Sequence, residues 1–176
     1  MRVITGIYKG RHFDIPRTFK ARPTTDFAKE NIFNVLNGYI DFDGAAALDL
    51  FAGTGSISLE MLSRGCRPVV SVEADRDHAH FISECMKKIG TRDNVLIRGD
   101  VFRFLKKCHE QFDVIFADPP YALEELPTIP ALVFDNDLLK PDGIFVFEHG
   151  KTHDFSDSPH FLEHRSYGSV NFSLFR

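Results

Sequence analysis

The chain changes its pattern of apolar and polar positions near residue 46. Beyond that point short apolar runs alternate with segments whose apolar residues recur at helical spacing, which predicts strands and helices in turn. We expect strands at 46–51, 69–73, 95–97, 112–117 and 144–147, with helices at 56–64, 75–89, 101–108 and within 124–139. Such alternation builds βαβ units, so the sequence predicts an α/β fold, doubly wound around a mostly parallel sheet.

The two ends of the chain depart from this rhythm. Residues 2–15 predict two short strands around Gly6 and Gly10, and the Thr-Thr-Asp stretch that follows predicts the start of a helix over 26–38. We therefore expect an N-terminal extension at 1–40, a β-hairpin plus helix, and a main domain at 41–176. A β-turn is expected at 140–143, and residues 161–175 predict a closing hairpin around Gly168.

Composition narrows the class of protein. A content of 43% hydrophobic and 26% charged residues is typical of a globular protein and argues against disorder. No apolar run approaches the roughly 20 residues of a membrane-spanning helix, and the first residues do not form a signal peptide. Three cysteines without C-x-x-C spacing favour reduced thiols over a disulfide or zinc scaffold. We expect a cytoplasmic protein that does not contact a membrane.

Charge is distributed unevenly along the chain. The net charge is −4, but residues 1–22 hold six basic side chains against the single acid Asp14, a local net of +5. A basic arm on an acidic body is typical of a surface that meets phosphates, although a solvated face gives the same pattern. The basic residues of the arm are Arg2, Lys9, Arg11, Arg17, Lys20 and Arg22.

Acidic residues follow the first three predicted strands. In open α/β sheets ligands bind at the carboxyl ends of the strands. Asp49 ends the first strand before Gly53-Thr-Gly55, where glycines let backbone N–H groups approach a ligand, although an ordinary turn has the same composition. Glu73 is placed to accept hydrogen bonds from ribose hydroxyls, and Asp100 is placed to accept one from an adenine amino group. Taken singly, either residue is equally well interpreted as an ordinary surface acid. Together these strand ends predict an adenosine-shaped pocket.

The fourth strand ends in Asp118-Pro119-Pro120-Tyr121. A carboxylate and a carbonyl held by two prolines can accept both N–H groups of an exocyclic amine, while the aromatic ring stacks on the base. This cluster predicts chemistry on the amino group of a nucleobase. The eight histidines do not form a convincing set of metal ligands, and we expect no metal.

The order LDLFAGTG, VEAD, GD and DPPY resembles class I S-adenosylmethionine-dependent methyltransferases that act on exocyclic amines. The stretches MRVITGIYKGRHFDIP and RPTTDFAKENIFNVL are similar to the bacterial 16S rRNA (guanine-966-N2)-methyltransferase family. The resemblance runs from Met1 through Glu148 and loosens in the tail. Phe27 stands where that family more commonly has a basic residue.

This resemblance implies a Rossmann-like class I methyltransferase fold, with a seven-stranded, mostly parallel sheet, a C-terminal β-hairpin and a small N-terminal extension. It implies S-adenosylmethionine as cofactor, S-adenosylhomocysteine as product, and 16S rRNA within the small ribosomal subunit as partner of a monomer. The implied cofactor-binding residues are Thr24, Thr25, Asp49, Phe51, Ala52, Gly53, Gly55, Glu73, Ala74, Asp100, Val101 and Asp118. The implied catalytic residues are Asp118, Pro119, Pro120 and Tyr121, and the RNA contacts are Arg2, Lys9, Arg11 and Arg22.

Two other functions remain open at this point. A DNA amino-methyltransferase, acting on N6 of adenine or N4 of cytosine, shares the DPPY cluster, although 176 residues leave little room for a target-recognition domain. A non-catalytic RNA-binding factor in ribosome assembly could use the same scaffold. The intact DPPY and the three pocket acids favour an enzyme.

Overall fold

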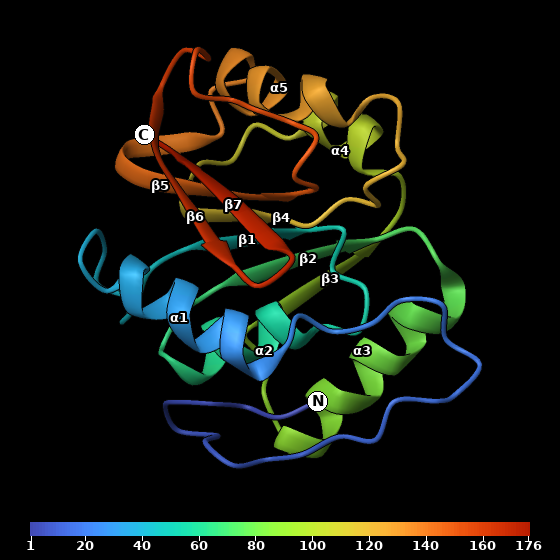
Figure 1. Cartoon of the computed structure of the whole chain (residues 1–176). Coiled ribbons are helices and arrows are strands. Elements are labelled where there is room, and N and C mark those ends of the chain that lie inside the picture. Colours follow the sequence, from blue (N-terminus) through green and yellow to red (C-terminus); the bar gives the residue numbers. More distant parts are fainter.

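The computed structural model describes all residues from 1 to 176 as one α/β layer structure (Figure 1). The strands are β1 (Ala47–Leu50), β2 (Val69–Glu73), β3 (Asn94–Arg98), β4 (Phe112–Ala117), β5 (Leu139–His149), β6 (Phe161–Tyr167) and β7 (Val170–Phe175). The helices are α1 (Asp26–Leu36), α2 (Ser56–Ser63), α3 (Arg76–Ile89), α4 (Val101–Lys107), the 3-10 helix η1 (Leu126–Thr128) and α5 (Ile129–Asp135). No helix is both long enough and apolar enough to cross a membrane.

All seven strands form one sheet in the order β3-β2-β1-β4-β5-β7-β6. Strands β1 to β5 run parallel, whereas β7 pairs antiparallel with both β5 and β6. The mostly parallel sheet and the closing hairpin are therefore as predicted from the sequence. Because β1, β2, β4 and β5 are parallel neighbours, the loops that follow them gather at one edge of the sheet.

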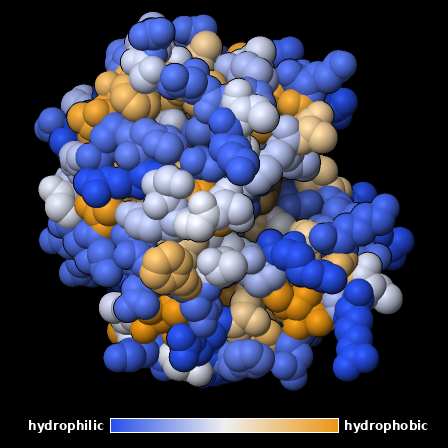
Figure 2. Space-filling view, viewed as in Figure 1, coloured by the Kyte–Doolittle hydropathy of each residue, from blue (hydrophilic) through white to orange (hydrophobic).

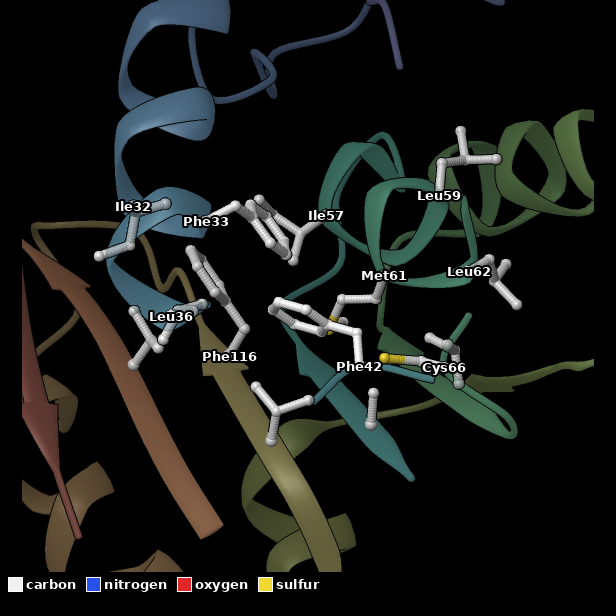
Figure 3. Close-up of a cluster of buried hydrophobic side chains, with 14 of the residues drawn as sticks. Ile32, Phe33, Leu36, Phe42, Ile57, Leu59, Met61, Leu62, Cys66 and Phe116 are labelled. Carbon is white, nitrogen blue, oxygen red and sulfur yellow. The ribbon is translucent and has the colours of Figure 1, made fainter. Parts of the chain in front are cut away.

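Helices cover both faces of the sheet. In Figure 1, α1, α2 and α3 lie on one side and α4 and α5 on the other. Successive residues of a strand point to opposite faces, so Ala47 belongs to the first core and Leu48 to the second. In the first core, Phe33 of α1 and Ile57 of α2 approach Phe116 of β4 (Figure 3). The face of the molecule seen in Figure 2 is mostly hydrophilic, with apolar residues in small separate patches.

The expected turn at 140–143 lies inside β5 rather than before it. The pairing of β4 with β5 jumps from Phe112–Leu139 to Val114–Ile144, so the intervening residues bulge out of the ladder. Gly143 fits this bulge because a Cβ there would lie 2.9 Å from the Lys140 carbonyl oxygen. The helix expected within 124–139 is also short, because it is divided into η1 and α5.

The predicted pair of strands at 2–15 is present only as a short antiparallel contact, in which Met1 and Phe13 exchange backbone hydrogen bonds and the Val3 N–H donates to the Arg11 carbonyl oxygen at 3.0 Å. This segment, which we call the arm (residues 1–22), has one isolated antiparallel bridge between Arg2 and His12. The backbone N–H groups of Ile4 and Thr5 donate instead to the two oxygens of the Glu60 carboxylate on α2, at 2.9 and 3.0 Å. A side chain on a distant helix therefore binds the arm directly after this short pairing ends.

A buried ion pair lies beneath the arm. Glu60 is fully buried, and its carboxylate also accepts from the Arg64 guanidinium at 3.1 Å. Lys29 of α1 is 1% exposed; its Nζ lies 3.7 Å from Glu60 and donates to Ser56 and to the Arg2 carbonyl oxygen. Burial lowers the pKa of Lys29, and the Glu60 charge opposes that shift. The pair therefore joins the arm, α1 and α2 in the interior.

We expect Glu60→Gln to lower the free energy of unfolding by about 3–5 kcal/mol, because Lys29 is left buried without its counter-charge. Urea denaturation gives this value, and limited trypsin digestion reports release of the arm at Lys9 and Arg11. The control is Glu30→Gln, which neutralises an exposed acid on α1. Equal stability of the two variants would contradict the anchoring role of Glu60.

Candidate active site

A cavity of about 870 Å³ lies where the carboxyl ends of β1, β2, β4 and β5 meet. Its walls come from the loops after these strands and after β3, and from the arm segment that reaches Thr24. A second hollow of about 890 Å³ lies between the arm and the carboxyl ends of α1 and α2, away from these strand ends. Only the first cavity collects the acids that the sequence places after strands.

The loop after β1 has an unusual backbone. Phe51 has a φ of 61°, Gly53 of 58° and Gly55 of 79°, so three of its residues are in the left-handed region. Gly53 lines the cavity, and its N–H donates to Glu73 at 2.6 Å. Gly55 does not line the cavity; it starts α2, and a Cβ there would lie 3.0 Å from Ile82 of α3. The two glycines thus differ in role, since Gly55 allows helices to pack closely.

Asp49 lies at the floor of this cavity and is 1% exposed. Its Oδ2 accepts from the Ser58 N–H at 3.0 Å and the Ser58 hydroxyl at 2.6 Å, and that hydroxyl lies 2.6 Å from Ser71 Oγ. Burial raises the pKa of Asp49 to about 7, although the Ser58 hydrogen bonds act in the opposite direction. Ser58, where a dinucleotide fingerprint has its third glycine, therefore serves as a partner for Asp49.

The acids after β2 and β3 already bond to backbone N–H groups. Glu73 accepts from Gly53 with one oxygen and from the Asp75 N–H, at 3.0 Å, with the other. Asp75 caps the start of α3, and Asp100 caps α4 by accepting from the Arg103 N–H at 2.9 Å. These carboxylates are thereby held in fixed positions on the cavity wall.

The DPPY segment faces a further acid, Glu148, at the end of β5. Tyr121 donates its hydroxyl to Glu148 Oε1 at 2.8 Å, while Oε2 has no hydrogen-bond partner. Burial and the nearby charges of Glu148 and Asp49 raise the pKa of Asp118 well above its usual range. Burial also raises the pKa of Glu148. Each of the two neighbouring carboxyls therefore binds a proton more readily than a solvent-exposed carboxyl does.

The arm supplies the remaining wall. Lys20, Arg22 and Thr24 line the cavity, and Arg22 donates to the Phe19 carbonyl oxygen at 2.6 Å. The Phe19 ring packs against His78 of α3 at a centroid distance of 4.6 Å. This aromatic contact fixes the last part of the arm over the start of α3.

The structure brings most of the predicted pocket residues together. Those that line the cavity are Arg22, Thr24, Asp49, Phe51, Ala52, Gly53, Glu73, Ala74, Asp100, Asp118, Pro119, Pro120 and Tyr121. The lining residues that sequence reasoning missed are Lys20, Ala21, Pro23, Thr54, Ser56, Ile57, Asp75, His78, Phe102, Leu123 and Glu148. Glu148 had a signal, because it follows an apolar strand as the other acids do.

Other predicted residues lie outside the cavity wall. Thr25 caps α1 by accepting from the Ala28 N–H at 3.2 Å, and Val101 is buried at the start of α4. Arg2 pairs with Asp26 at 3.0 Å. Arg11 donates to the carbonyl oxygen of Lys88 near the end of α3, and Lys9 is exposed. Of the predicted RNA contacts, Arg22 alone is therefore part of the cavity.

The strand order, the antiparallel β7 and a cavity at the carboxyl ends of the parallel strands define the class I methyltransferase fold. The whole chain, residues 1–176, matches the model of the family described as "Conserved hypothetical protein 95", and it belongs to that family.

Named relatives support this placement. The chain is 37% identical to the "Putative rRNA methyltransferase YlbH" of Bacillus subtilis, over 86% of this chain and 83% of that protein. It is 30% identical to the "Ribosomal RNA small subunit methyltransferase D" of Haemophilus influenzae, over 100% of this chain and 93% of that protein. A solved structure, "Putative methyltransferase yhhF from Escherichia coli", is 26% identical with a TM-score of 0.86 and covers 99% of this chain and 96% of that one. The family resemblance seen in the sequence is therefore confirmed.

Asp49 makes stability depend on pH. The pKa of Asp49 is about 7 in the folded protein, against an ordinary value of 3.8. Protonation of Asp49 therefore contributes fully to the free energy of unfolding below about pH 3.8, and this contribution is lost as the pH rises through 7. We expect Asp49→Asn to gain stability relative to wild type between pH 5 and pH 8, by about 3 kcal/mol at most, because two pKa units separate pH 5 from the folded pKa. Urea denaturation at both pH values measures the change, with the exposed Asp157→Asn as control. A difference that is equal at the two pH values would contradict this reading.

Proposed function

We propose that the protein transfers a methyl group from S-adenosylmethionine to the exocyclic N2 of a guanine in 16S rRNA of the small ribosomal subunit, at the 966-type position. One observation carries the proposal: the DPPY segment and the acids after β1, β2 and β3 face a single cavity. The names of the relatives support rRNA as the substrate. We propose further that residues 1–40 act as an RNA-binding extension of a monomeric methyltransferase domain at 41–176.

The residues around the cavity fit this cofactor. Its volume lies within the range of about 300–1,000 Å³ for small-molecule sites. Glu73 would hold the ribose hydroxyls and Asp100 the adenine amine, with Phe51 and Phe102, whose ring centroids are 6.3 Å apart, flanking that end. The backbone at Gly53 would lie against the methionine part, beside Asp49. When bound, the sulfonium supplies an activated methyl group.

The DPPY segment would orient the target amine. Asp118 and the Pro119 carbonyl accept its two N–H groups, and the half-exposed Tyr121 ring stacks on the base. The amine is a weak nucleophile because its lone pair is drawn into the ring, so alignment is the main contribution. Once the nitrogen becomes cationic it is strongly acidic, and Asp118 takes its proton. The raised pKa of Asp118 suits this role as proton acceptor.

Mapping the methyl group tests the proposed function. The protein is incubated with isotope-labelled S-adenosylmethionine and with small ribosomal subunits from a strain that lacks the enzyme. We expect label in 16S rRNA at N2 of one guanine. A parallel incubation contains DNA in place of the subunits, and label on its adenine or cytosine would favour the DNA enzyme. Tight RNA binding without label would favour the assembly factor.

We expect Asp118→Ala to slow methyl transfer by roughly 30- to 1,000-fold, since one oriented acceptor in a buried site is lost. Substrate affinity should change little, because this contact acts mainly in the transition state. Tyr121→Ala should weaken RNA binding as well, by about 1–3 kcal/mol of lost stacking. Single-turnover rates and binding isotherms are measured in parallel. Full activity in Asp118→Ala would refute its proposed role.

The arm is predicted to contact phosphates. Replacing Arg2, Lys9 and Arg11 with Ala should lower RNA affinity and flatten the slope of log K against log salt by about 2–3. Cofactor affinity should not change, because none of the three lines the cavity. Lys106→Ala with Lys107→Ala on α4, across the sheet from the arm, is the control. An unchanged salt slope would mean that the basic residues of the arm form a solvated surface and do not contact RNA.

A further inference from the structure

Glu148 carries an unsatisfied acceptor inside the cavity. The residue is 6% exposed, and its Oε2 is the one buried side-chain oxygen or nitrogen in the chain without a hydrogen-bond partner. Its other oxygen is fixed by the Tyr121 hydroxyl at 2.8 Å. A buried acceptor without a donor is costly, and such atoms in folded proteins call for an explanation. The cavity therefore contains an acceptor atom in a fixed position, Glu148 Oε2, that lacks a hydrogen-bond donor.

The surroundings of Glu148 indicate where the donor comes from. Asp118 and Thr24 face the same carboxyl, and all three line the cavity. Burial and the charge of Glu148 raise the pKa of Asp118, and burial raises the pKa of Glu148 against the opposing effect of its side-chain hydrogen bonds. A ligand edge that brings N–H groups to both carboxyls would relieve this cost. The edge must carry two donors side by side.

Guanine has such an edge. Its ring N1–H lies next to the exocyclic N2 amine, so two adjacent nitrogens donate. In adenine and cytosine the exocyclic amine lies next to an unprotonated ring nitrogen, which is an acceptor. A carboxylate that faces that ring nitrogen would meet a lone pair instead of a proton. The pair of carboxyls therefore matches guanine and opposes the two bases of the DNA enzymes.

We propose that Glu148 is a specificity-determining residue, whose free Oε2 accepts the N1–H of the target guanine while Asp118 holds the adjacent N2 amine. This inference rests on the proposed methylation of guanine and deepens it. Tyr121 has two parts in this arrangement: its ring stacks on the base, and its hydroxyl fixes Oε1 so that Oε2 stays directed at N1. A site that hydrogen-bonds a substrate N–H discriminates strongly against analogues that lack it.

The test compares guanine with 2-aminopurine at the methylated position of small-subunit rRNA. 2-Aminopurine keeps the N2 amine and the stacking face, but its N1 is an acceptor. We expect wild type to prefer guanine by about 100-fold or more in kcat/KM. In Glu148→Gln an amide N–H is able to donate to that N1, so the preference should fall at least tenfold, with part of the gain arising from faster 2-aminopurine turnover. Tyr121→Phe, which releases Oε1, should lower the preference less.

The controls separate this inference from the proposed function. Glu110→Gln, an exposed acid before β4, should keep the wild-type preference, and cofactor binding should be equal in all variants. If wild type methylates neither substrate, the proposed function fails. If it methylates guanine but accepts 2-aminopurine equally well, Glu148 does not read N1. A Glu148→Gln protein that folds, as judged by circular dichroism, and retains the full preference would overturn the inference too.

Discussion

The buried carboxylate of Glu60 is the contact on which the position of the arm depends. It accepts two backbone N–H groups of the arm and faces the ammonium of Lys29, all within the interior. A buried charge is stable only when it is paired and hydrogen-bonded, so these partners hold one another in place. The arm continues into the segment that ends at Thr24, which lines the cavity. The buried contacts of Glu60 therefore also help to position one wall of the cavity. An interaction on α2, outside the cavity wall, thus shapes the site.

The acids of the cavity divide into two kinds. Glu73 and Asp100 are satisfied by backbone N–H groups in the free protein, which fixes them as rigid parts of the wall. Asp118 and Glu148 are not satisfied in this way, and the pKa of each is raised. In the proposed function, the first kind orients the cofactor through positions set by folding. The second kind is poised for donors that a substrate brings, which is a form of preorganisation.

The sequence predicted the sheet well because the central strands β1, β2 and β4 and the second half of β5 are buried apolar runs, and local pattern reports burial directly. The strand-end rule located Asp49, Glu73, Asp100 and Asp118, all of which line the cavity. The same rule applied to the fifth strand points to Glu148. The hairpin predicted in the arm is shorter than expected because the N–H groups of Ile4 and Thr5 bond to Glu60, a partner that lies 56 and 55 residues away in the sequence. Such long-range pairing leaves no trace in local periodicity.

Acidic side chains line the cavity, and the phosphate backbone of RNA is negatively charged. This limits the orientations in which RNA can enter the cavity. When ionised, the carboxyls of Asp49, Asp118 and Glu148 repel phosphates at close range, since the buried site screens charge poorly. Lys20 and Arg22, on the arm side of the same cavity, offer the opposite charge. In the proposed reaction the phosphates therefore stay near the arm while the base enters with its donor edge first.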